Sequence, residues 1–180
     1  MAERELAPGE WAVLALLSER PAHGWALATQ LGPGGQLGSV WSLGRPLVYR
    51  SIDILAERRL IEPVGHEPGL RGPNRTVFGA TEAGCEAVAA WLLQPVEHVR
   101  DVRSLLLLKL VFAERAQVDL RPMLAEQHDG VAEAVRSLEA RARASSGSDA
   151  ILLRFRLEST RAVLRFVEGL LGPAELRAAV

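Results

Sequence analysis

The feature that most restricts how this chain can fold is a helix that begins at a proline and runs directly into a pair of strands. Pro46 has the fixed φ angle and the missing amide that suit the first position of a helix, and helical spacing continues from it to about Arg59. Strand patterns follow at residues 60–64 and 76–80, on either side of a turn segment, residues 65–75, that is rich in glycine, proline and arginine. These patterns predict a long hairpin with a basic tip directly after the helix.

Two helices are expected before this one. Apolar residues are dense at 10–18, and a second helix is predicted at 24–31, with Trp25 and Leu27 on its inward side. In the proline-started helix, the residues expected to pack inward are Leu47, Val48, Ser51, Ile52, Ile54 and Leu55, and those expected to face solvent are Arg45, Tyr49, Arg50, Asp53 and Glu57. After the hairpin, Thr81 is the expected N-cap of a helix at 82–95.

The remainder of the chain has only helical patterns, at about 102–113, 122–144 and 150–171. The last of these helices carries two apolar stripes that lie about 100° apart around its axis. The first stripe contains Leu153, Leu157, Thr160, Leu164, Val167 and Leu171, and the second contains Leu152, Phe155, Phe166 and Leu170. One neighbouring helix cannot cover both stripes, so we expect a second subunit to cover one of them. The predicted dimerisation residues are Leu153, Leu157, Leu164, Val167 and Leu171; burial of both stripes within one chain is the alternative.

Length and charge limit the architecture and the partners. A chain of 180 residues with 48% hydrophobic residues can bury one core or two small ones, and we place the domains at 1–95 and 96–180. The formal net charge is −1, so the chain as a whole does not favour a polyanionic partner. Between residues 45 and 75, however, six arginines stand against four acidic residues. Any nucleic-acid surface must therefore be local.

Several functional classes lack the residues that they need. No apolar run is long enough to cross a bilayer, and the acidic start has no signal-peptide pattern, so we expect no membrane partner and a cytoplasmic location. The single Cys85 excludes an intrachain disulfide and is expected to be a small core residue on an apolar helical face. The four histidines and the carboxylates form no catalytic motif. We therefore expect no enzyme activity, no metal and no other cofactor.

The predicted order of elements is helix, helix, loop, proline-started helix, strand, basic turn, strand, which is the layout of a winged helix-turn-helix. The expected fold class is mainly α with a small β-hairpin wing, comprising an N-terminal winged helix-turn-helix and a C-terminal helical dimerisation domain. Such a domain places its third helix in the major groove of double-stranded DNA and its hairpin against the phosphates. The candidate DNA-binding residues are Ser42, Arg45, Tyr49, Arg50, Arg71, Asn74 and Arg75. Arg50 can offer a bidentate fork to guanine or clamp a phosphate, and for each candidate a solvated surface role is the alternative.

An ordered series of short motifs runs along most of the chain. The motifs are His23-Gly24-Trp25, Leu47-Val48-Tyr49-Arg50 followed by Ile54-Leu55, Arg58-Arg59-Leu60-Ile61-Glu62, Thr76-Val77-Phe78, Thr81-Glu82-Ala83-Gly84, Arg100-Asp101 and Leu107-Leu108-Lys109-Leu110. This series resembles the PadR family of transcriptional regulators. The resemblance implies a homodimeric repressor that a small molecule or another signal releases from a palindromic operator, with Tyr49 touching the DNA backbone. The chain departs from the family pattern at Arg45-Pro46, where a small residue and a serine are usual, and at Trp25, where a tyrosine is usual.

Two further hypotheses concern ligands. The four tryptophans, Trp11, Trp25, Trp41 and Trp91, are expected near the junction of the two domains, where aromatic walls could hold a small aromatic effector. Ordinary packing of tryptophans in the core is the alternative. For the chain as a whole, the alternative function is a winged-helix module that binds a ligand or a protein without binding DNA.

Overall fold

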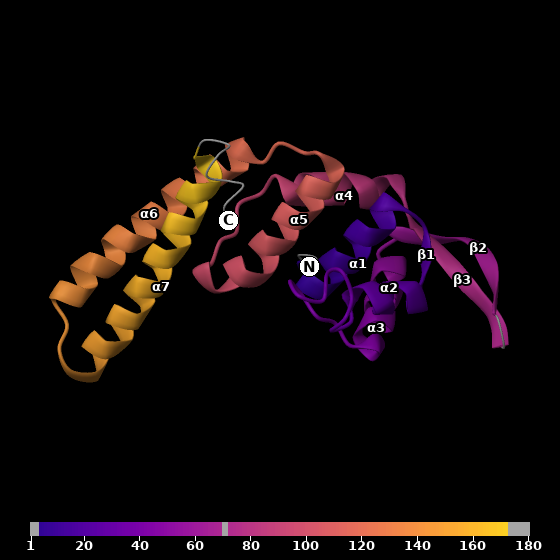
Figure 1. Cartoon of the computed structure of the whole chain (residues 1–180), viewed down its shortest axis with the longest axis horizontal. Helices are drawn as coiled ribbons and strands as arrows, with labels where there is room; N and C mark the ends of the chain where they lie inside the picture. The colour runs from indigo at the N-terminus through magenta and orange to yellow at the C-terminus, as the bar shows by residue number, and fades with distance from the viewer. Residues whose placement is uncertain (1–3, 70–71, 173–180) are drawn as a thin grey trace. The chain divides into compact units, whose positions relative to one another are not determined.

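The structure of the chain is a computed structural model that describes residues 4–69 and 72–172. Its elements fall into two units (Figure 1). The first unit contains Met1–Leu92 and Arg103–Val118, and the second contains Leu93–Val102 and Asp119–Val180. The first boundary lies close to the predicted division at residue 95, but residues 103–118 belong with the N-terminal unit rather than with the C-terminal one.

Helix α1 is the centre of the first unit. The elements of this unit are α1 (Pro8–Glu19), β1 (Ala22–His23), α2 (Gly24–Leu31), α3 (Arg45–Glu57), β2 (Ile61–Gly69), β3 (Gly72–Ala80), α4 (Glu82–Leu92) and α5 (Leu107–Ala116). Every residue at 12–17 is buried, because α1 packs against α3, α4, β3 and α5. This burial on all sides explains why its apolar residues are too dense for an amphipathic pattern.

The three strands form an antiparallel sheet in the order β1-β3-β2. Ala22 and His23 of β1 pair with Phe78 and Val77 of β3, and β2 pairs with β3 from Ile61 opposite Ala80 to Gly69 opposite Gly72. The predicted strands at 60–64 and 76–80 are therefore present but were predicted too short. Register shifts at Pro63/Gly65 and at Glu67/Gly69 allow the ladder to continue past the glycine and proline residues.

The order α1, β1, α2, α3, β2, β3 is that of a winged helix, so the predicted fold class is confirmed. We call the β2–β3 hairpin, residues 61–80, the wing; it extends away from the helices of its unit in Figure 1. Strand β1 was not predicted, because two residues carry no periodicity and only their distant partners in β3 define them as a strand.

The start of α4, directly after the wing, is joined to the end of α3 by hydrogen bonds of Thr81. The Thr81 hydroxyl accepts a hydrogen bond from the Gly84 amide at 3.1 Å, as expected of an N-cap, and donates one to the Arg59 carbonyl at 2.9 Å. A Cβ atom on Gly84 would lie 2.1 Å from the Leu60 carbonyl oxygen, so only glycine fits at this position. The Thr-Glu-Ala-Gly motif is therefore a packing element between the end of α3 and the start of α4.

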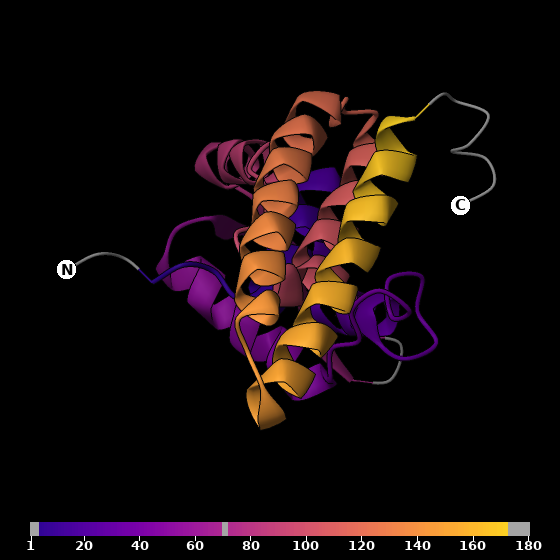
Figure 2. The same ribbon diagram turned by 90° about the vertical axis from the view of Figure 1, so that its left-hand side faces the viewer.

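The second unit is built on an antiparallel pair of helices, α6 (Arg121–Arg143) and α7 (Gly147–Leu171), which lie side by side in Figures 1 and 2. Both helices were predicted within a few residues of these bounds. In the remaining predicted helix, at 102–113, a π-helical turn at Val102–Leu106 precedes α5. No helix of the described residues 4–69 and 72–172 is both long and apolar enough to cross a membrane.

The two stripes of α7 differ in burial. Leu153, Leu157 and Val167 of the first stripe are buried in the unit that α7 forms with α6, so these three residues already have a partner within the chain. Leu152 and Phe155 of the second stripe are 47% and 70% exposed, and the neighbouring Ile151 is 75% exposed. The apolar surface that α7 exposes therefore includes Leu152 and Phe155 of the second stripe, and the contact of the first stripe with a second subunit stays a prediction.

Candidate nucleic-acid interface

Helix α3 has one buried and one exposed side. Its buried residues are Val48, Ser51, Ile52 and Leu55, and its exposed residues include Arg45, Tyr49, Arg50, Asp53 and Glu57, as predicted. Leu47 was predicted to pack inward, which is wrong, because it is 50% exposed. It lies about 100° around the helix from Val48 and falls outside the buried stripe.

Charge is divided along the exposed side of α3. The first half of the helix carries Arg45 and Arg50, whereas the second half carries Asp53 and Glu57. Phosphate oxygens are attracted to the arginines and repelled by the carboxylates. Only the first two turns of α3, together with the exposed Ser42 in the segment before it, are therefore suited to contact with a nucleic acid.

The ring of Tyr49 is placed by a glycine at the start of α2. A Cβ atom on Gly24 would lie 2.7 Å from Cε1 and 2.9 Å from Cζ of Tyr49, so the ring lies directly on the Gly24 backbone. Tyr49 is nevertheless 43% exposed. Its hydroxyl can donate to a phosphate oxygen while the ring keeps a defined position.

The wing residues predicted to contact DNA differ in their surroundings. Asn74 is exposed, whereas Arg75 is partly buried. The Cζ atom of Arg75 lies 5.3 Å from the ring centroid of Trp25, a cation–π contact, and its Nη1 lies 3.5 Å from Nε2 of His23. Arg75 is therefore held by α2 and is not a freely solvated charge. Arg71 lies outside the described residues.

The triplet His23-Gly24-Trp25 thus touches both parts of the candidate interface. Gly24 contacts Tyr49 of α3, while His23 and Trp25 contact Arg75 of the wing. The prediction that Trp25 packs inward is wrong, because Trp25 is 47% exposed beneath Arg75. Sequence reasoning missed this role of the triplet. A signal for it was present, since a histidine directly before the first residue of a helix stands at the N-cap position.

The four tryptophans do not form one cluster among the described residues. Trp11 and Trp91 stack with their centroids 4.9 Å apart, whereas the described aromatic contact of Trp25 is with His23. Within residues 4–69 and 72–172, no ring contact joins Trp25 or Trp41 to the stacked pair. The indole nitrogens of Trp11 and Trp41 are buried without a hydrogen-bond partner among these residues. Because Trp11 and Trp91 fill space against one another, their geometry favours the core-packing alternative.

Lys109 of α5 contacts Trp91 of the stacked pair. Its Nζ donates to the Trp91 carbonyl oxygen and lies 4.4 Å from the centroid of the Trp91 ring. Lys109 is only 2% exposed. Loss of hydration on burial lowers the pKa of this amine from 10.5 to about 8, against the opposing effect of Glu5.

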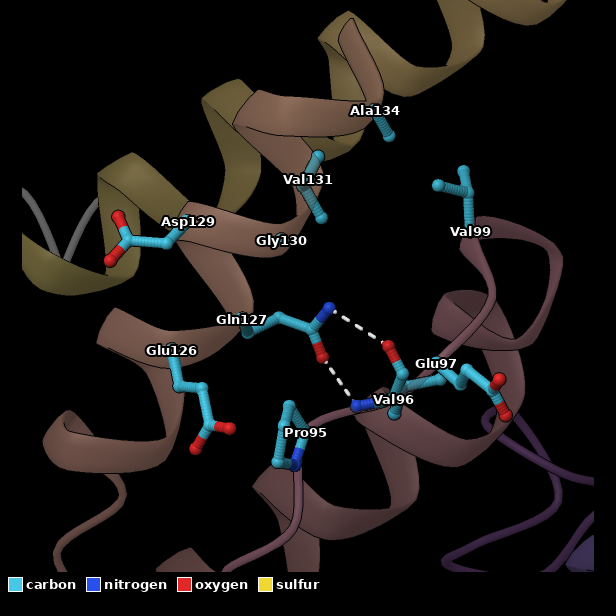
Figure 3. A pocket seen from close by; sticks show the side chains of 10 residues that line it. All are labelled: Pro95, Val96, Glu97, Val99, Glu126, Gln127, Asp129, Gly130, Val131 and Ala134. Carbon is cyan, nitrogen blue, oxygen red and sulfur yellow. Dashed lines mark hydrogen bonds between the residues drawn. The ribbon is translucent and has the colours of Figure 1, made fainter. Parts of the chain in front are cut away.

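A cavity of about 390 Å³ lies in the second unit, between α6 and residues 95–99. The side-chain amide of Gln127 accepts from the Val96 amide at 2.6 Å and donates to the Val96 carbonyl at 3.0 Å (Figure 3). Val99 and Val131 line the cavity from its two facing walls. Aliphatic and acidic residues line this cavity and no tryptophan does, so it differs from the effector site predicted from the sequence.

The cysteine and the histidines are distributed over both units. Cys85 was predicted to be a core residue, which is wrong, because it is exposed on α4. Within the described ranges, no group of three or more histidine, cysteine, aspartate or glutamate residues could hold a metal ion. His23 and His66 both lie in the first unit, on β1 and β2, whereas His98 and His128 belong to the second unit.

Comparisons with solved structures find proteins of similar fold. Bacillus subtilis PadR in complex with operator DNA is 18% identical, with a TM-score of 0.44 over 91% of this chain and 97% of that one. The Vibrio cholerae virulence activator AphA is 22% identical, with a TM-score of 0.38 over 96% of this chain and 99% of that one. No protein-family model matches the chain, and no curated protein matches it.

Proposed function

We propose that the chain is a sequence-specific DNA-binding transcriptional regulator of the PadR type. The observation that supports this most strongly is the triplet at the start of α2, which holds Tyr49 of α3 and Arg75 of the wing on neighbouring residues. A winged helix binds DNA with these two elements together. If α3 and the wing form one DNA-facing surface, their relative positions must be fixed, and the triplet contacts both elements.

In this proposal the first two turns of α3 enter the major groove. Arg50 forms a bidentate contact with guanine or clamps a phosphate, and Arg45 and Tyr49 contact the backbone. Asp53 and Glu57 keep the second half of the helix away from the phosphates, because carboxylates repel them. Asn74 and Arg75 supply the contacts of the wing, and Arg71, which lies outside the described residues, stays a candidate from the sequence.

The proposed regulator acts in the cytoplasm as a homodimer and as a repressor that a signal releases. The exposed residues Ile151, Leu152 and Phe155 of α7 support the dimer, because a contiguous apolar patch of this kind is typical of an association surface. A two-fold dimer presents its two α3 helices to half-sites about 34 Å apart. A small aromatic effector remains a prediction, which quenching of tryptophan fluorescence by candidate compounds tests.

A winged-helix module that binds a ligand or a protein without DNA is the second candidate. It is favoured by the carboxylates near the proposed surface, since Glu67 lies opposite Arg75 in the ladder, and Asp53 and Glu57 follow Arg50 on α3. These groups reduce the local positive charge on which non-specific DNA affinity depends.

DNA binding is tested by fluorescence anisotropy with duplexes from the region upstream of the gene, titrated with salt. We expect binding that weakens steeply with salt concentration. Replacing Arg71 and Arg75 together by alanine should lower the affinity for all sequences alike and reduce the salt slope by about 0.9 for each phosphate contact that is lost. Arg50→Ala should instead change the preference among bases, by about 1–3 kcal/mol at the position that it contacts.

The matched control is Arg136→Ala on α6, which removes an exposed arginine of the second unit. This variant should bind DNA as the parent does. The proposal fails if no duplex from the upstream region binds with a steep dependence on salt. If the double wing variant binds as tightly as the parent, the wing has no role in DNA binding.

A further inference from the structure

His23 occupies an unusual position, because it ends strand β1 and also caps helix α2. Its side chain is nearly buried, with 8% of the residue exposed. The Nδ1 atom accepts a hydrogen bond from the Ala26 amide at 3.1 Å. An acceptor nitrogen carries no proton, so in the neutral ring the proton must be on Nε2. The cap of α2 therefore fixes the tautomer of His23.

The protonated Nε2 atom points to the wing. Oε2 of Glu67, on β2, lies 3.3 Å from it, and this carboxylate is the acceptor that the tautomer requires. Nη1 of Arg75, on β3, lies 3.5 Å from the same nitrogen, but it cannot donate to an atom that already bears a proton. Arg75 is held instead by the ring of Trp25 beneath it, and its position in β3 is opposite that of Glu67 in β2.

These contacts lie beyond the last backbone pairing between the wing and β1. Strand β1 pairs with β3 only at Phe78 and Val77, whereas the wing continues outward to Gly69 and Gly72. Glu67 and Arg75 form a cross-strand pair in this outer part. The register shift at Pro63/Gly65 lies between this part and the base of the hairpin, and such a shift bends and twists a ladder. The side chains of His23 and Trp25 therefore secure the wing where the backbone of β1 no longer does.

We propose that His23 is a positioning residue that sets the direction of the wing, by joining the cap of α2 to Glu67 and thereby to Arg75. This inference rests on the proposed function, because a fixed wing direction serves contact with DNA phosphates. His23 itself touches no DNA in this proposal. It acts through Glu67 and through the position of Arg75 over Trp25.

The test distinguishes two roles of His23, the cap of α2 and the contact with Glu67 of the wing. His23→Asn keeps an oxygen that can cap α2, since asparagine is a favoured N-cap, but its side chain is too short to reach Glu67. Glu67→Gln keeps a hydrogen-bond acceptor for His23, whereas Glu67→Ala removes it. The control is Glu62→Ala, which removes the same charge from an exposed position of β2 that pairs with Gly79 at the base of the wing.

Two measurements are made on each variant. The first is hydrogen–deuterium exchange of wing peptides in the DNA-free protein, and the second is DNA affinity as a function of salt. In His23→Asn and Glu67→Ala we expect exchange in the outer wing to accelerate about tenfold, the effect of losing one hydrogen bond to a charged group. Both variants should also bind DNA more weakly than Glu62→Ala. Glu67→Gln should show the exchange of the parent, and it should bind DNA as Glu62→Ala does, because both variants remove one negative charge from the wing.

Failure of this inference can be distinguished from failure of the proposed function. If exchange in the outer wing is the same in His23→Asn, Glu67→Ala and the parent, His23 does not position the wing, whatever the DNA measurements give. If exchange accelerates but DNA affinity stays at the level of Glu62→Ala, the wing direction is irrelevant to binding and the inference is overturned. If exchange accelerates and the parent binds no DNA, the link through His23 stands and the proposed function fails.

Discussion

Lys109 allows the sharpest quantitative prediction for the first unit. It is the only lysine in the sequence, it is 2% exposed, and its Nζ contacts the carbonyl oxygen and the ring of Trp91. In the unfolded chain this amine titrates near its ordinary value of 10.5, whereas burial lowers its pKa in the folded chain to about 8. Folding and protonation of Lys109 are therefore linked.

The sign and the size of this linkage follow from the two pKa values. Between about pH 8 and 10.5 the unfolded chain holds a proton that the folded chain has already released, so the free energy of unfolding rises with pH across this window. Below about pH 8 the amine is charged in both states, and the cost of burying the charge is constant. The gap between 10.5 and about 8 corresponds to about 3 kcal/mol, since one pH unit of pKa change is worth about 1.4 kcal/mol.

The assay is chemical denaturation of the parent and of Lys109→Met at several values between pH 7 and 10.5. Methionine has a similar length and no charge, so the stability of the parent relative to this variant should increase by about 3 kcal/mol across the window. All other ionisable groups are the same in both proteins, so their contributions cancel from the difference. In parallel, NMR of the single lysine side chain should give a midpoint near pH 8. A midpoint above 10, or a difference in stability that does not vary with pH, would refute the reasoning.

Two further predictions concern the second unit. Gln127→Leu leaves the amide and the carbonyl of Val96 without their buried partner, so denaturation should show a loss of about 2 kcal/mol; an unchanged unfolding free energy would mean that water replaces the amide. Phe155→Ser removes a side chain that is 70% exposed in the single chain, so it should leave the unfolding of the monomer nearly unchanged but weaken self-association in sedimentation velocity. Dimers as tight as those of the parent would exclude the second stripe of α7 as the interface.

Much of the fold could be predicted because its signals are local. Pro46 marks the start of α3 within one residue, and Thr81 caps α4 as expected. The helices α6 and α7 extend over long periodic segments, which are the easiest elements to recognise. Each of these signals lies within a few residues of the element that it defines.

The candidate site was predicted only in part. The exposed residues Arg45, Tyr49 and Arg50 follow from helical spacing on α3. The contacts of Arg75 do not, because His23 and Trp25 are about fifty positions away in the sequence and meet it only through the pairing of β1 with β3. Trp25 illustrates the reason. An aromatic residue on an apolar helix is expected in the core, but here a cation covers it at the surface.

The sequence by itself determined the order of the elements, the proline-started α3 and the two apolar stripes of α7, since periodicity and caps depend on neighbouring residues. Tertiary structure decided that Leu153 and Leu157 are buried and that Leu152 and Phe155 are exposed, because α6 packs against only one side of α7. It also decided that His23 joins α2 to Glu67 in the wing, since the tautomer of a histidine is set by groups that only folding brings to its two nitrogens.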